Sequence, residues 1–265
     1  MSSLTKIAPG ARIGRNVEIG DFTIVHDDVV IGDGCKIDSH CVIGYPNLMA
    51  QGRPLVIGAN STIRSHSVFY QGSTFGEGLA TGHGVLVREN TTAGRGLRIG
   101  SNSDIEGDAV FGDWVRLHSE VHVGKGAKIG HFVWLYPRVQ FTNDPFPPSH
   151  LCLEVAIDDM AVIATGVLLM PGVHVGLGAF VGAGSVVRAD VPDIHCVTGD
   201  PARTFTTLDR FVSFEYGLKA PWPRHFRDAY PETSYALMDE VTGRVHAAIA
   251  AYRAYPASAG EGQRC

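Results

Sequence analysis

Several common features are missing from this sequence of 265 residues. No run approaches the roughly 18 apolar residues that span a bilayer, and the first twenty residues lack a charged and then apolar leader, so a cytoplasmic protein without a membrane partner is expected. Basic residues form no block and the formal net charge is -5, which argues against nucleic acid as a partner. The cysteines contain no CxxC pair, so the sequence predicts neither a disulfide framework nor a metal site; they are Cys35, Cys41, Cys152, Cys196 and Cys265.

Glycine, by contrast, is abundant, with 32 residues, and its placement follows a period of six. Large apolar residues recur at every sixth position from Ile13 to Ile43, from Ile57 to Phe141 and from Ile157 to Val187, except at Thr81 and Ala93, which makes 27 hexads. A small or β-branched residue stands two positions before most of these lead residues, as at Cys35 and Cys41. Glycine often follows the lead residue, where a turn requires a positive φ or close backbone approach.

A strict period of six fits neither a 3.6-residue helix nor simple strand alternation, but it fits a short strand followed by a tight turn. The lead residue and the residue two positions before it then point inward, with one outward residue between them. Three hexads make a triangular coil of about 18 residues, so the sequence predicts an all-β parallel solenoid of about nine coils. A β-sandwich would instead show strands spaced about 8 to 12 residues apart.

Two proline-bearing segments interrupt the period at residues 45–55 and 142–155, and both are expected to project as loops. The β-helix is expected to occupy residues 1–204 and a helical extension residues 205–265. Within the extension, apolar residues at helical spacing between Thr233 and Tyr255 predict a helix that caps the open end of the solenoid or packs on a neighbouring subunit. Residues 257–265 are expected to fray.

The segment AVIATGVLLMPGVHVGLGAFVGAGSVVRADVPDIHCVTGDPAR, residues 161–203, resembles the acyl-CoA-binding half and closing signature of the hexapeptide-repeat acyltransferases. Asp200 stands where that family's closing motif usually has Asn. The resemblance implies a left-handed parallel β-helix, a homotrimer with sites between subunits, and acetyl-CoA or another acyl-CoA as co-substrate.

Two further segments, residues 100–130 and the stretch VWLYPRVQFTNDPFPP at 133–148, resemble the branch that N-acylates nucleotide-linked amino sugars. The nearest similarity is to enzymes that act on dTDP-3-amino-3,6-dideoxyhexoses. The resemblance therefore implies a small-molecule acyltransferase, most simply an N-acetyltransferase, whose acceptor is a nucleotide sugar.

Transfer from a thioester to an amine requires an uncharged amine, a route for its proton and donors for the oxyanion. In the hexad from Leu117 to His122, His118 and Glu120 fall on the turn, and both are candidate catalytic residues. Asp113 occupies the previous turn, and in a threefold assembly it could share a cleft with Glu120 of a neighbour. The sequence leaves open whether a side chain or the leaving thiolate takes the proton.

Polar outward residues supply the candidates for binding the acceptor. Asn143 and Asp144, in a loop stiffened by proline, are predicted to hydrogen-bond the sugar or nucleotide. Arg88 and Arg116 are predicted to pair with the diphosphate. The other two candidates, which stand outward on strands, are Asp104 and His122.

The family match implies a second set of residues that contact the acyl-CoA. Small residues on turns leave room for the pantetheine arm, and arginines meet its phosphates. These residues are Ala164, Gly166, Gly182, Ala183, Arg188 and Arg203.

Three alternatives remain at this stage. The first is O-acetylation of a sugar hydroxyl. The second is a zinc site of the carbonic-anhydrase kind, built on His118 and His122 with His83 or His131, although two histidines four residues apart in one hexad have no reason to converge on one ion. The third is a scaffold without catalytic activity.

Overall fold

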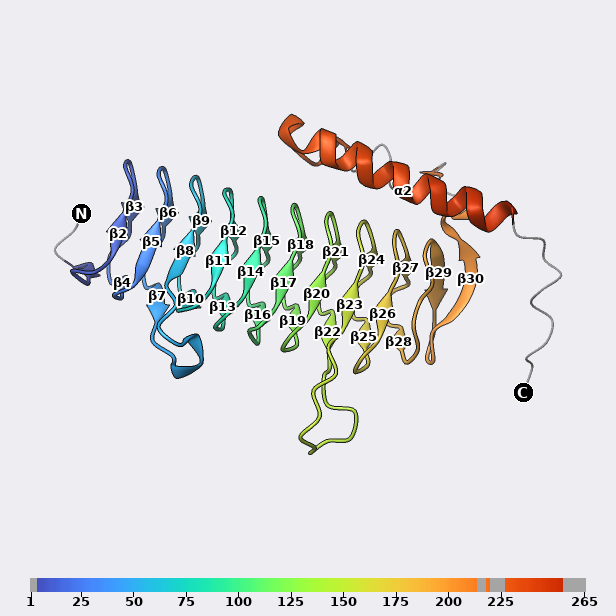
Figure 1. The fold of residues 1–265 in the computed structure, drawn as a ribbon, viewed down its shortest axis with the longest axis horizontal. Helices are drawn as coiled ribbons and strands as arrows, with labels where there is room; N and C mark the ends of the chain where they lie inside the picture. Colours follow the sequence, from blue (N-terminus) through green and yellow to red (C-terminus); the bar gives the residue numbers. More distant parts are fainter. Residues whose placement is uncertain (1–3, 214–217, 220–226, 255–265) are drawn as a thin grey trace.

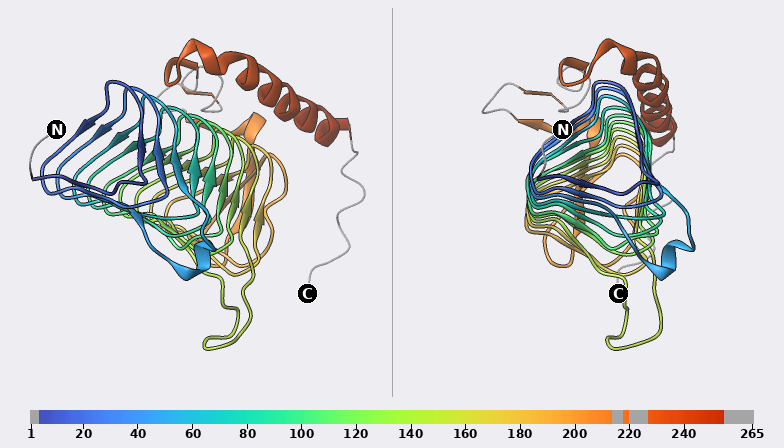
Figure 2. Two further views of the ribbon diagram at one scale, coloured as in Figure 1. Left: turned by 60° about the vertical axis from the view of Figure 1, so that its left-hand side comes forward. Right: turned by 90° about the vertical axis from the view of Figure 1, so that its left-hand side faces the viewer.

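The computed structural model describes residues 4–213, 218–219 and 227–254, which form a left-handed parallel β-helix with one long helix along its side (Figure 1). Along the prism, strands pair in parallel with the strand one coil further on, which is 18 residues away where no loop intervenes, as Asp104 of β16 does with His122 of β19. The coils stack into a prism with three sheets as its faces (Figure 2). The predicted fold class is therefore confirmed.

Sheet A has ten strands: β1 (Lys6–Ile7), β4 (Ile24–Val25), β7 (Val42–Tyr45), β10 (Val68–Tyr70), β13 (Leu86–Val87), β16 (Asp104–Ile105), β19 (His122–Val123), β22 (Gln140–Phe141), β25 (Leu168–Leu169) and β28 (Val186–Val187). Sheet B has nine: β2 (Arg12–Ile13), β5 (Val29–Ile31), β8 (Leu55–Ile57), β11 (Thr74–Phe75), β14 (Thr92–Ala93), β17 (Val110–Phe111), β20 (Lys128–Ile129), β23 (Ala156–Ile157) and β26 (His174–Val175).

Sheet C has eleven strands: β3 (Glu18–Ile19), β6 (Lys36–Ile37), β9 (Thr62–Ile63), β12 (Ala80–Thr81), β15 (Arg98–Ile99), β18 (Arg116–Leu117), β21 (Trp134–Leu135), β24 (Val162–Ile163), β27 (Phe180–Val181), β29 (His195–Thr198) and β30 (Arg203–Thr207). The remaining elements are η1 (Leu48–Ala50), η2 (Leu208–Arg210), β31 (Val212–Ser213), β32 (Leu218–Lys219), η3 (Glu232–Ser234) and α2 (Tyr235–Ala254).

The hexad pattern sets the core. Lead residues such as Ile31 and residues two positions earlier such as Val29 are buried inside the prism, and Cys35 and Cys41 are buried in the same positions. The outward residue between each pair lies on a sheet face. Because three hexads close one coil, residues 18 apart in an uninterrupted stretch become neighbours on the same face or turn.

The solenoid is longer than predicted, with about eleven turns rather than nine. Strand β1 precedes the first hexad counted from Ile13, and β29 continues sheet C beyond Val187 after an irregular turn. Strand β30 then returns antiparallel to β29 and closes that sheet. The count fell short because it began at Ile13, although Ile7 of β1 keeps the same period, and because β29 does not keep it.

The glycines after the lead residues serve close approach rather than positive φ. A Cβ added at Gly58 would lie 2.4 Å from the carbonyl carbon of Gly76 in the next coil. The left-handed conformation occurs two residues later in the turn, at residues such as Asn60 (φ 56°) and Asn102 (φ 56°). Of the two reasons predicted for these glycines, close packing of the coils is therefore the one that holds.

Helix α2 lies along the side of the prism and does not cap its open end (Figure 1). Its buried residues Met238, Val241 and Val245 pack on the turns between sheets B and C, the B–C edge, at Phe132 and Met160. Arg244 of the helix pairs with Asp159 on the same edge. Residues 257–265, expected to fray, lie outside the described residues.

Both inserted loops leave the turns between sheets A and B, the A–B edge, on the opposite side from α2 (Figure 1). They follow β7 and β22, and the first lies between Tyr45, which ends β7, and Leu55, which begins β8. In the part of the chain that the structure describes, helices fall short of the length and apolarity that a membrane span requires.

Candidate active site

The turns between sheets C and A, the C–A edge, bring two of the predicted catalytic residues and four of the predicted acyl-CoA residues into one column. Strands β18, β21, β24 and β27 pair in register. The residues that follow them are therefore successive rungs of this edge: His118, Tyr136, Ala164 and Gly182. Glu120, Gly166 and Ala183 belong to the same turns.

Beyond Tyr136, the residues of this edge have small side chains or none, so little side-chain bulk covers the backbone. A Cβ added at Gly166 or at Gly184 would meet no atom within 4 Å. Ala164 is partly exposed and Ala183 is exposed, whereas Gly182 is buried. An extended thioester arm can therefore approach the backbone closely along these rungs.

His118 packs against the aromatic rung next to it. Its ring stacks on Tyr136 with centroids 4.6 Å apart and planes inclined by 14°. Burial, and then the positive charge of Arg116, lower the pKa of His118. His118 is therefore neutral near neutral pH and available as a proton acceptor, though a weaker base than a free histidine.

Glu120 is held by the next coil. Its carboxylate accepts a 2.7 Å hydrogen bond from Nε of Arg138, which stands 18 residues further on. Glu120 also adopts the left-handed turn conformation, with φ 60°. Its side chain is about half exposed and the ion pair faces solvent. The catalytic role of Glu120 therefore stays a prediction.

Asp113 lies on a different edge of the prism. Its carboxylate accepts bonds from the backbone N–H and the guanidinium of Arg95 on the B–C edge, whereas Glu120 lies on the C–A edge. Asp33 holds Arg15 in the same way four coils earlier. Asp113 thus bonds neighbouring coils together, and a cleft shared with Glu120 would require a second subunit.

The best-defined acid–base pair is His122 with Asp104, on the outward face of sheet A. His122 Nδ1 lies 2.8 Å from Asp104 Oδ2. The hydrogen bond to Asp104 raises the pKa of His122, against the opposing effect of burial. Because a carboxylate on Nδ1 favours the tautomer whose Nε2 is free to accept, this pair has the geometry of an oriented general base.

Sequence reasoning named both residues as acceptor ligands and missed their pairing. The signal was present, because 104 and 122 are 18 apart and both are outward positions. Neighbours in adjacent coils are read directly from that spacing, as are Glu120 with Arg138 and Asp113 with Arg95.

Next to the pair, the A–B edge carries Arg88, Glu106 and Asn143. Asn143 Nδ2 donates to Glu106 Oε2 at 3.4 Å, which ties the second loop to the prism close to Asp104. Arg88 makes an ion pair with Glu89 at 3.0 Å. The predicted acceptor residues Arg88, Asp104, His122 and Asn143 therefore lie close together.

Asp144 faces its own loop. Its oxygens accept from the backbone N–H groups of Phe146 and Ser149 and from the Ser149 hydroxyl. These bonds, chiefly those from Ser149, lower the pKa of Asp144. Asp144 thus shapes the loop that carries Asn143, a task the sequence did not predict.

Arg116 lies apart from Arg88, on sheet C beneath the C-terminal extension. Its guanidinium lies over the rings of Trp134 and Tyr230 and donates to the carbonyl of Ala229. Burial lowers the pKa of Arg116. Arg116 faces outward as predicted, but the extension covers it, so the two arginines do not form one diphosphate clamp within the chain.

The last predicted acyl-CoA residues lie at the C-terminal end of the solenoid. Arg188 makes an ion pair at 3.3 Å with Asp200. Asp200 is the residue that departs from the family's closing motif. Arg203 begins β30 and is exposed. Both stand further along the prism than Ala164.

Histidine ligands for a metal do not converge at this site. His118 stacks on Tyr136 at the edge, while His122 bonds Asp104 on the sheet face. Within residues 4–213, 218–219 and 227–254, no three histidine, cysteine, aspartate or glutamate side chains gather as metal ligands would.

Comparison with known proteins agrees with this architecture. Residues 6–45 match the family model described as bacterial transferase hexapeptide (six repeats). Over these residues the repeat is similar to that of the hexapeptide-repeat transferases. A bifunctional protein GlmU from Exiguobacterium sp. is 31% identical over 185 residues, which cover 68% of this chain and 38% of that protein.

Two further relatives extend the likeness. The acyl-[acyl-carrier-protein]–UDP-N-acetylglucosamine O-acyltransferase of Bartonella bacilliformis is 32% identical over 141 residues, covering 49% of this chain and 47% of that protein. The structure of an Arabidopsis UDP-N-acetylglucosamine acyltransferase superposes with a TM-score of 0.64 at 20% identity, covering 77% of this chain and 73% of that one, which shows a shared fold. The hexapeptide-repeat chain spans less than half the length of these two curated relatives.

Proposed function

We propose that this protein transfers an acyl group, most simply acetyl, from acyl-CoA to the amino group of a nucleotide-linked amino sugar such as a dTDP-3-amino-3,6-dideoxyhexose. The observation that carries the proposal is the His122–Asp104 pair on sheet A. It lies between an edge of small residues suited to the donor and an edge with two loops suited to the acceptor.

In the proposed reaction the sugar amine attacks the thioester carbonyl carbon. His122 Nε2 takes a proton from the amine as the C–N bond forms, and Asp104 stabilises the resulting imidazolium through Nδ1. The tetrahedral intermediate then collapses, the C–S bond breaks and coenzyme A leaves as the thiol after accepting a proton. His118 and Glu120, one turn earlier, border the donor on the C–A edge and remain the rival candidates for the base.

The acceptor in this proposal occupies the A–B edge. Asn143 hydrogen-bonds the sugar, and Arg88 meets the diphosphate with the side of its guanidinium that faces away from Glu89. The donor lies along Ala164, Gly166, Gly182 and Ala183, with Arg188 and Arg203 near its phosphates.

A homotrimer is part of the proposal, and the outward row of sheet A supports it. After Lys6 in β1, this row is apolar from Ile24 to Leu86 and again at Leu168 and Val186, and it is polar between them at Asp104, His122 and Gln140. A face of this composition suits burial against a second copy that leaves a polar opening at the reacting groups. Its apolar members are Ile24, Val42, Val68, Leu86, Leu168 and Val186.

A thiol-release assay with acetyl-CoA tests the proposal. We expect release of coenzyme A with dTDP-3-amino-3,6-dideoxyhexoses and none with the matching hydroxyl sugars. The similarity to a UDP-N-acetylglucosamine O-acyltransferase favours a second candidate, O-acylation, with an acyl-carrier-protein donor. Turnover with hydroxyl acceptors alone would overturn the N-acyl assignment in favour of that candidate.

A further inference from the structure

Glu89, on the A–B edge, is a charged residue without exposed surface: its side chain is 0% exposed. A buried carboxylate is costly unless charged or hydrogen-bonding partners surround it. The partners of Glu89 are Arg88, its neighbour in the chain, and Asn47, which belongs to the first inserted loop. Burial at a turn position that is usually solvated indicates a specific task.

The first partner, Arg88, binds the Glu89 carboxylate through one side of its guanidinium. Nε and one terminal nitrogen of Arg88 donate to the two carboxylate oxygens of Glu89, at 3.3 and 3.0 Å. The remaining N–H groups of the guanidinium point away from the carboxylate, and the side chain is 40% exposed. Glu89 therefore fixes the direction in which Arg88 presents its free donors.

The second partner fixes the loop. Asn47 Nδ2 donates to Glu89 Oε2 at 2.8 Å, while Asn47 Oδ1 accepts from the backbone N–H of Met49 and caps η1. Glu89 thus holds the residue that starts the only turn of helix in this loop, among the described residues.

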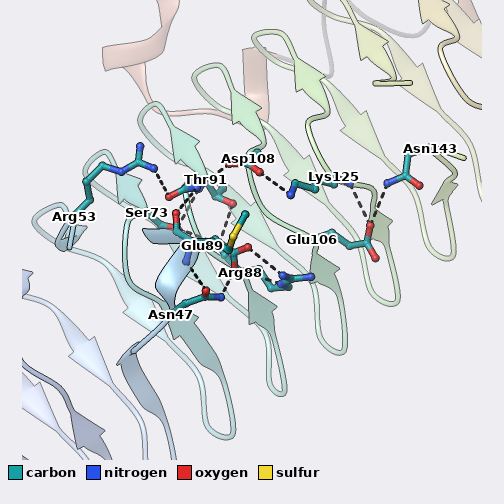
Figure 3. A network of polar contacts seen from close by, with 12 residues as sticks. Asn47, Arg53, Ser73, Arg88, Glu89, Thr91, Glu106, Asp108, Lys125 and Asn143 are labelled. Atoms are coloured by element: carbon teal, nitrogen blue, oxygen red, sulfur yellow. Dashed lines mark hydrogen bonds and ion pairs between the residues drawn. The ribbon is translucent and has the colours of Figure 1, made fainter. Parts of the chain in front are cut away.

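Neighbouring contacts bind the same loop to the prism (Figure 3). Arg53 donates to Asn90 Oδ1 at 2.8 Å, and Asn90 donates both to the carbonyl of Met49 and to Asp108. Ala50 is fully buried, close to Gly72. The first loop is therefore folded onto the edge as a fixed wall, and the second loop is tied at Glu106 on the same edge.

We infer that Glu89 is a positioning residue for the acceptor: it orients Arg88 toward the diphosphate and fixes residues 45–55 as one wall of the acceptor site. The inference rests on the proposed function and deepens it. Glu89 itself is buried and touches neither substrate. Its loss should therefore weaken acceptor binding and leave the distant acyl-donor edge unaffected.

The test compares Glu89→Gln with Asp159→Asn in the full-length protein. Asp159 is a matched control because it is also a largely buried carboxylate paired with an arginine, Arg244. It lies on the B–C edge, away from the A–B edge that carries Glu89. We expect Glu89→Gln to raise the KM for the dTDP-amino sugar about tenfold or more and to change the KM for acetyl-CoA less than about twofold. Asp159→Asn should change neither KM, whatever it does to the melting temperature.

A second variant and a second measurement separate positioning from general damage. Asn47→Ala leaves the Arg88–Glu89 ion pair intact, so it should speed amide hydrogen exchange at residues 50, 51 and 53 and raise the acceptor KM by a smaller factor. An unchanged acceptor KM in both variants, or equal changes in both KM values, would leave Glu89 as an ordinary structural residue and overturn the inference.

Binding of dTDP, measured by calorimetry, distinguishes failure of the inference from failure of the proposed function. If the wild type acylates none of the dTDP-amino sugars but binds dTDP, and Glu89→Gln weakens that binding, the reaction is wrong and the positioning role stands. If the wild type fails to bind dTDP, or Glu89→Gln binds it equally well, the positioning role is wrong.

Discussion

His118 and His122 stand four residues apart and have pKa values displaced in opposite directions. Burial lowers the pKa of His118, whereas the hydrogen bond that His122 donates to Asp104 raises the pKa of His122. A raised pKa means that the folded state binds the proton more tightly, so this contribution to stability is complete below the unfolded pKa. It is lost as pH rises through the folded pKa. Activity that needs neutral His122 has the opposite pH dependence, because it increases as the pH rises through that pKa.

The pH profile of kcat/KM therefore identifies the base. With His122 as base, the acid limb should have its midpoint above the ordinary histidine value of about 6.5. Asp104→Asn should move the midpoint down and lower kcat, because the imidazolium loses its partner. A midpoint below about 6.5 that Asp104→Asn leaves in place would assign the proton to His118 instead.

Replacing a glycine by alanine is expected to have opposite effects on stability in a coil and in α2. An alanine at Gly58 would place its Cβ 2.4 Å from the backbone of the next coil, so Gly58→Ala should destabilise by about 1–3 kcal/mol. Gly243, in α2, has open space around it, and Gly243→Ala should stabilise by about 0.5–1 kcal/mol through its helix propensity. Urea unfolding at matched protein concentration measures both, and equal effects would contradict the packing account.

At the scale of elements, α2 is held by bulky residues in an unusual backbone conformation. Trp114, Phe132 and Met160 take the left-handed turn position that glycine and asparagine hold elsewhere, with φ of 64°, 57° and 55°. This conformation costs about 1 kcal/mol or more for a residue with a Cβ. The apolar contacts of Phe132 and Met160 beneath the helix offset that cost.

Removing one of those contacts should loosen the helix. Met238 is 3% exposed in the cluster, and Met238→Ala should lower the free energy of unfolding by about 2–5 kcal/mol. Glu240, exposed on the same helix, serves as the control, and Glu240→Ala should stay within about 0.5 kcal/mol. Equal losses in chemical unfolding would mean that α2 does not pack on the B–C edge in solution.

For the whole molecule, the proposed assembly rests on the outward row of sheet A. A charge in its apolar part should oppose burial against another copy, so Leu86→Glu is expected to reduce the mass in solution from a trimer to a monomer and to abolish turnover. Thr92→Glu puts the same charge on the exposed outward position of sheet B and should leave both unchanged. Sedimentation equilibrium with circular dichroism provides the measurement; a folded Leu86→Glu trimer would contradict the proposed interface.

The sequence by itself determined the solenoid, its core and its rungs. A period of six in short strands leaves one outward residue per hexad, and three hexads per coil make positions 18 apart neighbours. Asp104 with His122 and Glu120 with Arg138 follow from that arithmetic alone. The column of small residues on the C–A edge follows from it too.

Only the tertiary structure decided what the non-repeating segments do. The period is interrupted at the two loops, residues 45–55 and 142–155, and it ends beyond Val187. It therefore carries no information about the path of a loop or the side on which a helix packs. Asn47 meets Glu89 across 42 residues, and Arg244 meets Asp159 across 85, because chain folding brings them together without a repeat to relate them. The burial of Glu89 arises from those contacts, since its turn position in the hexad is otherwise one that faces water.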